Sequence, residues 1–182
     1  MALLTLAEAK TQLDIETVAH DVELQAYVDA LTSVIEGIVG AVEEQTVTET
    51  VRGQGRALCL LRTPVLALAS LVPTGDGGTA LEVDRLHVDG PSGVVERRDA
   101  GRFTGGPWTA VYTAGRTTVP PTINLAARIL LQHLWRTQNG SARGISSADD
   151  FSVTEPVPGF GYAVPNRVLQ LLEPFKSPPG VA

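Results

Sequence analysis

Hydrophobic and polar residues follow a helical period most clearly within residues 120–138. On a helical wheel the apolar side chains share one wide arc, and a polar row lies on the opposite side. Pro121 suits the first turn, because the N–H that proline lacks has no partner there, and Asn139-Gly140 is a typical stop. We predict a helix over 121–138 that neighbouring elements cover on most of its sides. The arc consists of Ile123, Ala126, Ala127, Leu130, Leu131 and Leu134.

The N-terminal segment predicts two further helices. Thr5 and Glu8 have the spacing of a capping box, in which each side chain bonds the backbone N–H of the other, so a short helix should run to Leu13. A second apolar stripe with helical spacing begins after Asp21, whose negative charge favours a helix N-terminus, and ends at Gly40.

Between residues 45 and 119 the helical period disappears, and short β-type runs alternate with glycine-rich turns. The short connections predict a mostly antiparallel arrangement of about six strands. Gly53-Gln54-Gly55 has the composition of a hairpin connection, and the doubly apolar run Ala57–Leu61 suggests a central strand. The apolar phase slips by one residue at Asp84-Arg85, which predicts a turn or bulge there. The expected strands cover 46–51, 57–61, 66–72, 81–88, 94–97 and 108–113.

These patterns together predict an α+β fold. A small helical bundle comes from residues 1–44 and 119–140, and residues 45–118 form a mostly antiparallel β module inserted into it. Residues 141–182 are expected to form an extended C-terminal arm with one short helix that begins at Pro165.

Composition narrows the class of protein. The 182 residues include 43% hydrophobic residues, enough for a packed core, and 14 Lys+Arg against 20 Asp+Glu give a formal charge of −6. This balance disfavours a nucleic-acid binder that grips phosphates. The single cysteine, Cys59, excludes an intramolecular disulfide. No leader-like segment and no run near the roughly 18 apolar residues of a membrane span occurs, so we expect a soluble protein made in a reducing cytoplasm.

No catalytic or metal-binding motif is present. The histidines His20, His87 and His133 lie in different predicted elements without metal-ligand spacing. The glycine-rich loops lack the Lys-Ser or Lys-Thr that completes a phosphate-binding loop, and no Gly-x-Ser-x-Gly sequence occurs. We therefore expect neither enzymatic activity nor a cofactor, and we name no catalytic, cofactor-binding or metal-binding residue.

Several aromatic side chains remain without a role. Trp135 lies at the edge of the apolar arc, and other aromatics lie in segments with little regular pattern. Ordering such segments costs entropy that only packing can offset, and packing on the same chain or on a partner subunit would serve equally well. The candidate partner-binding residues are Trp135, Phe160, Tyr162, Leu171, Leu172 and Phe175.

The order of several short motifs resembles the head–tail connector (adaptor) proteins of long-tailed bacteriophages. The resemblance covers most of the chain and is strongest over residues 3–40 and 108–136. It is carried by Leu4-Thr5-Leu6-Ala7-Glu8-Ala9-Lys10, the acidic helix start Asp21–Ala30, Thr63-Pro64-Val65, Val111-Tyr112-Thr113-Ala114-Gly115, Val119-Pro120-Pro121 and Gln132-His133-Leu134-Trp135.

The resemblance implies a virion protein at the head–tail interface. It implies a helical core with an insertion, and a self-assembled ring, usually twelve-fold, that docks beneath the portal protein and leads DNA towards the tail. A downstream neck or tail-completion protein would be a further partner. A net-negative channel would let DNA pass without sequence-specific binding.

Within this interpretation, residues 141–182 would dock on the portal or on a neighbouring subunit, anchored by Leu171, Leu172 and Phe175. Two other interpretations stay open. One is a different neck component, such as a stopper or tail-completion protein. The other is an enzyme or small-ligand binder that uses a cleft in the β module.

Overall fold

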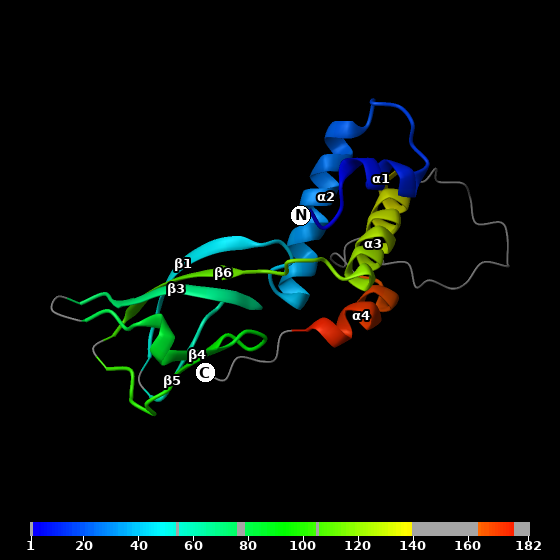
Figure 1. Ribbon diagram of the computed structural model, residues 1–182. Coiled ribbons are helices and arrows are strands. Elements are labelled where there is room, and N and C mark those ends of the chain that lie inside the picture. Colours follow the sequence, from blue (N-terminus) through cyan, green and yellow to red (C-terminus); the bar gives the residue numbers. More distant parts are fainter. Residues whose placement is uncertain (1, 54, 76–78, 105, 140–163, 177–182) are drawn as a thin grey trace. The chain divides into compact units, whose positions relative to one another are not determined.

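The structure is a computed structural model, and its class is α+β, as the sequence predicts (Figure 1). Helices α1 and α2 come first in the chain, strands β1–β6 follow, and helices α3 and α4 come last. The structure describes residues 2–53, 55–75, 79–104, 106–139 and 164–176.

As far as their residues are described, two compact units can be distinguished. The unit that we call the β-unit consists of Met1–Leu3, Ser33–Pro120 and Pro174–Ala182. The unit that we call the helical unit consists of Leu4–Thr32 and Pro121–Glu173. Residues 21–39 form one unbroken helix whose first part belongs to the helical unit and whose last turns belong to the β-unit. The division into core, β module and arm at residues 44, 118 and 140 stays a prediction.

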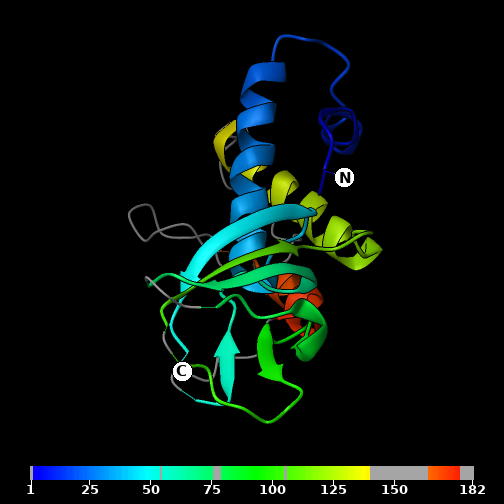
Figure 2. The ribbon, with the colours of Figure 1, turned by 60° about the vertical axis from the view of Figure 1, so that its left-hand side comes forward.

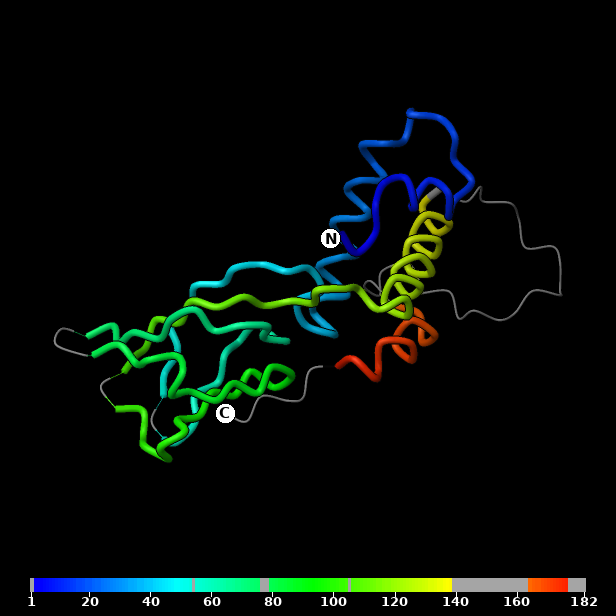
Figure 3. Tube along the Cα trace, in the orientation of Figure 1, coloured from blue at the N-terminus to red at the C-terminus, as the bar shows by residue number. Residues whose placement is uncertain are grey.

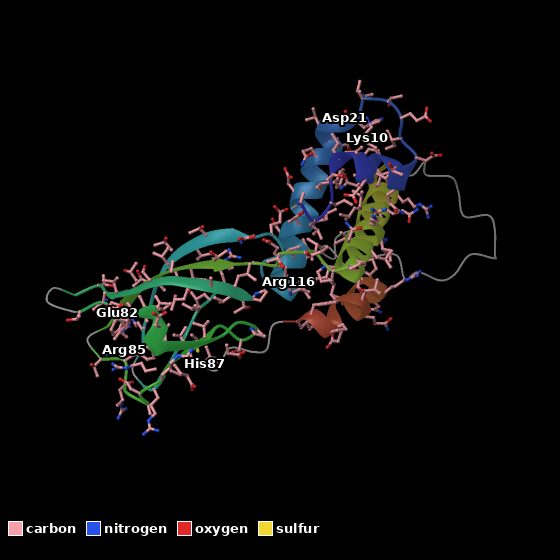
Figure 4. The ribbon with its side chains drawn as sticks, viewed as in Figure 1. Lys10, Asp21, Glu82, Arg85, His87 and Arg116 are labelled. Atoms are coloured by element: carbon pink, nitrogen blue, oxygen red, sulfur yellow. The ribbon has the colours of Figure 1, made fainter. Side chains whose placement is uncertain are left out.

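The helices begin and end close to where the sequence predicts. The capping box is present, because Thr5 Oγ1 accepts a hydrogen bond from the Glu8 backbone N–H at 3.2 Å and Glu8 Oε2 accepts one from the Thr5 N–H at 2.9 Å. Figure 4 shows Lys10 beside Asp21, whose carboxylate lies 2.6 Å from Nζ. This ion pair connects two consecutive helices. The helices are α1 (Leu6–Leu13), α2 (Asp21–Val39), α3 (Pro121–Asn139) and α4 (Asn166–Leu172).

Helix α3 packs against both α1 and α4 within the helical unit. The predicted apolar arc is its buried face, with Leu134 half-buried and the other five residues fully buried. Leu125, which interrupts the polar row, is 45% exposed. Arg128 on that row donates a hydrogen bond to Glu8 Oε1 at 2.8 Å, so the capping box of α1 is also tied to α3.

The strands form two antiparallel three-stranded sheets in the β-unit. Their orders are β1-β6-β3 and β2-β5-β4, and β6 runs between β1 and β3 in the tube view (Figures 2 and 3). Both sheets contribute to one hydrophobic core that includes Leu58, Leu71, Val95, Trp108 and Tyr112. The strands are β1 (Gln45–Val51), β2 (Ala57–Cys59), β3 (Val65–Pro73), β4 (Leu86–Asp89), β5 (Val94–Arg97) and β6 (Trp108–Ala114).

Two predictions about strand pairing are wrong. Gly53 and Gly55 do not close a hairpin, because β1 pairs with β6 and β2 pairs with β5. The strand within Ala57–Leu61 is an edge strand, not a central one, because the order of its sheet is β2-β5-β4. The apolar residues of this run are not equally buried, because Leu58 and Leu60 are buried whereas Leu61 is exposed. Local composition therefore set the strand but not its neighbours.

The predicted slip at Asp84-Arg85 is present as a turn. Val83–Arg85 form a single 3-10 turn, η1, and β4 begins directly after it at Leu86. Upstream, the expected strand is reduced to one bridge between Leu81 and Leu71. The turn restores the phase, so that Leu86 is buried in the shared core.

Candidate functional site

Trp135, the candidate on α3, packs inside the helical unit. Its ring makes edge-to-face contacts with His20, at a centroid distance of 5.4 Å, and with Tyr27, at 5.9 Å. The Tyr27 hydroxyl donates a hydrogen bond to Gln138 Oε1. Burial raises the pKa of the Tyr27 phenol. All three rings stay partly exposed, so this cluster is both a packing site and an accessible aromatic surface.

The two leucines of α4 differ in exposure although they are neighbours in sequence. Leu172 is 0% exposed and, with Val168, forms the buried face of a helix that packs on α3. Leu171 is only half-buried. A partner can therefore reach Leu171 directly, whereas contact with Leu172 requires α4 to move away from its own chain.

Phe175 is half-buried and lines a hollow of about 260 Å³ within the β-unit. Prolines form much of its wall, and two cationic side chains stand at it. A hollow of this size is at the small end for a ligand site. It is lined by Val39, Pro64, Pro91, Arg116, Pro174, Phe175 and Lys176.

Arg116 shapes this hollow and also terminates α2. Its guanidinium donates to the backbone oxygens of Val39 at 2.9 Å and Ala41 at 2.8 Å (Figure 4). Helix α2 has no basic residue in its last turn, and Gly40 there adopts a φ of 76°. Arg116 thus supplies from the end of β6 the positive charge that a helix C-terminus favours. Burial lowers the pKa of Arg116.

A partly buried polar network connects β6 to β1 and to the segment after β2. The Tyr112 hydroxyl donates to Glu49 Oε1 at 3.0 Å and accepts from the Arg62 backbone N–H, also at 3.0 Å. The same carboxylate oxygen accepts from the Leu61 N–H at 2.8 Å. Burial raises the pKa of Tyr112 well above its ordinary range. Because each group is satisfied by backbone or by a strand neighbour, the network fixes the β2–β3 connection against the sheet.

The last two candidate partner-binding residues, Phe160 and Tyr162, lie outside the residues that the structure describes. Within the residues that are described, no group of three or more His, Cys, Asp or Glu side chains is placed to hold a metal ion. The helices among them also include none that is both long and apolar enough to cross a membrane.

Sequence reasoning did not single out Arg116, because it lies in a loop-like Gly-Arg-Thr-Thr segment with no motif around it. The sequence signal that could have pointed to this contact lies in α2, whose C-terminus Arg116 binds. Helix α2 has no basic residue in its last turn, so a residue distant in sequence can supply the positive charge that its C-terminal carbonyls favour.

The profile of the head completion protein family matches residues 2–176. The class of protein is therefore a structural, non-enzymatic component of the head–tail neck of a phage-like virion. The chain belongs to the head completion protein family. No curated protein matches the chain in sequence.

Three solved structures with a similar fold come from gene transfer agent (GTA) particles. The chain resembles a protein in the neck of an empty GTA particle computed with C6 symmetry, with TM-score 0.64 and 21% identity over 99% of this chain and 92% of the other. It resembles equally, at 0.64 and 18%, one from the neck of a native GTA particle computed with C12 symmetry, with the same coverage. A third match, at 0.60 and 19%, is from the virion of a native gene transfer agent particle.

Proposed function

We propose that this protein is the head-to-tail adaptor, a ring that docks beneath the portal, extends the DNA channel and provides the attachment platform for the neck and tail. The observation that carries the proposal is the fold match over 99% of the chain to a neck protein in a particle computed with C12 symmetry. Twelve-fold symmetry fits a ring of twelve copies of this chain, each in the same environment.

The charge of the chain agrees with a conduit for DNA. Each copy has a formal charge of −6, so a ring of such copies carries a large net negative charge. Phosphates are repelled by such a surface, and DNA can slide through without being held. Passage without sequence-specific contacts is therefore the expected behaviour.

The C-terminal arm is the proposed portal-binding element. Leu171 and Phe175 are half-buried and carry apolar area that a partner can cover. Leu172 contributes from the inside, because it holds α4 on α3 and so sets the position from which Leu171 projects. Trp135, Phe160 and Tyr162 are the further candidate contacts.

The second candidate is a different neck component, a stopper or tail-completion protein. The observation in its favour is the match to a neck structure computed with C6 symmetry. Such a protein would bind the adaptor ring and not the portal, and it would assemble with six-fold symmetry.

Electron microscopy of the purified chain mixed with the portal protein of the same virion distinguishes the two functions. We expect a twelve-fold ring attached to the portal. Removal of residues 164–182 should abolish attachment while far-UV circular dichroism still shows the β-unit and α1–α3. Because truncation uncovers α3, the double variant Leu171→Ser/Phe175→Ser serves as the matched test on an intact chain. Attachment that survives both changes, or binding to another neck protein but not to the portal, refutes the adaptor function.

A further inference from the structure

The outer face of the β1-β6-β3 sheet is built almost entirely of uncharged β-branched and small residues. In β1 the outward residues are Thr46, Thr48 and Thr50, all exposed. They lie opposite Thr113, Val111 and Thr109 of β6, respectively. The inward positions of β6 are the buried residues of the core, so the two faces of this sheet are cleanly separated.

Strand β3 extends this outer face with apolar side chains. Leu66 is 42% exposed and Val72 is 40% exposed, and Ala67 and Ala69 between them are exposed as well. Single exposed hydrophobic residues are ordinary, but several on one strand beside a threonine ladder form a continuous uncharged surface.

Charge is missing from this surface. Strands β3 and β6 contain no charged residue, and β1 contains only Glu49. Glu49 belongs to the inner face, where its carboxylate accepts from Tyr112 and Leu61. In a chain that is 19% charged, all charge has been kept off the outward side of three adjacent strands.

The free edge of the sheet continues the same surface. All seven residues of β1 pair in register with β6 without a bulge, and β1 is the edge of its sheet. Solitary proteins commonly protect an edge with lysine, proline or a bulge, and the outward positions of β1 have none of these. At the opposite edge, β3 has two register shifts and a bridge to Leu81, so it is the less regular edge.

We propose that this outer sheet face, Thr46, Thr48 and Thr50 with Leu66, Val72 and Val111, is covered by a second copy of this chain. The inference rests on the proposed ring and assigns one side of its subunit contact. Two copies that each have a charge of −6 repel each other, and this face lets them approach without placing like charges together. DNA is the less suitable occupant, because the outward side of these strands has no Lys or Arg to neutralise phosphates.

The size of the face indicates how much of the contact it supplies. The seven paired positions along each of the three strands cover a plane of roughly 24 by 14 Å, about 340 Å². A stable interface buries about 800 Å² on each partner. The face therefore forms the uncharged centre of the contact, and neighbouring polar residues complete it.

Sedimentation velocity over a range of concentrations tests the proposal on the full chain. Thr48→Glu places a charge in the middle of edge strand β1, beside Val111 of the central strand, and Thr48→Gln adds the same bulk without charge. Val18→Glu adds an equal charge at a residue that is 78% exposed and outside the face. We expect Thr48→Glu to weaken self-association at least about tenfold, and Thr48→Gln and Val18→Glu to change it less than about threefold.

Far-UV circular dichroism first establishes that each variant folds, and Val72→Glu replaces Thr48→Glu if the latter does not. Equal weakening by Thr48→Glu and Val18→Glu overturns the inference, as does a wild-type chain that stays monomeric up to its solubility limit. Attachment to the portal is measured separately. If the protein binds the portal but Thr48→Glu does not weaken its self-association, this interface is refuted and the adaptor function stays intact. If Thr48→Glu has no effect and the protein also fails to bind the portal, both proposals are refuted.

Discussion

Adjacent leucines on α4 give the sharpest test of how the C-terminal segment works. Leu172→Ala removes a side chain that is 0% exposed and packs between α4 and α3. Truncating a buried leucine costs about 2–5 kcal/mol in transfer and cavity terms. For a chain of this length each kcal/mol lowers the thermal midpoint by about 2–4 °C, so we expect a fall of about 4–20 °C. Leu171→Ala, at a half-buried position, should cost about 1 kcal/mol.

Binding to the portal should respond in the opposite way. Leu171→Ala removes a surface contact and should weaken attachment, whereas Leu172→Ala at a temperature well below its midpoint should leave most of it. The assays are thermal melts followed by far-UV circular dichroism and co-sedimentation with the portal. Equal destabilisation by the two changes would contradict the packing of α4 on α3. Loss of attachment only in Leu172→Ala would contradict the surface role of Leu171.

Three further predictions concern the polar contacts. Tyr112→Phe should lower the free energy of unfolding by about 1–3 kcal/mol, because the Glu49 carboxylate loses a donor inside the sheet, whereas Tyr27→Phe at a more exposed hydroxyl should cost under about 0.5 kcal/mol; urea titrations of both compare them. Thr5→Ala should cost about 1 kcal/mol by removing the N-cap of α1. The effect of Thr5→Ala should fade in acid. Hydrogen bonds from Thr5, followed by the charge of Arg128, lower the pKa of Glu8 in the folded protein below its ordinary value of 4.5. The stabilisation by ionised Glu8 is therefore present above its unfolded-state pKa and is lost as pH falls through its folded-state pKa, which thermal melts across that range can show.

The comparison of sequence with structure shows which features are local. The capping box of Thr5 and Glu8, the helix that starts at Asp21 and the turn at Asp84-Arg85 were predictable, because each depends on contacts within a few residues. The apolar arc of α3 was predictable for the same reason: the helical period alone decides which side chains share a face. The exposed threonines of β1 are a local feature too, because the strand period alone places Thr46, Thr48 and Thr50 on one face.

Partners that are distant in sequence were decided only by the tertiary structure. Nothing near Gly53 shows that β1 joins β6 rather than β2, because strand pairing depends on which apolar faces can be buried together. Arg116 contacts Ala41 and Val39 at the end of α2, which precede it by 75 and 77 positions in the sequence, and no local pattern encodes these contacts. The different burial of Leu171 and Leu172 follows in the same way from the position of α3. The sequence determined the elements and their faces, whereas packing determined which faces remain open to a partner, because only the folded chain fixes what each face meets.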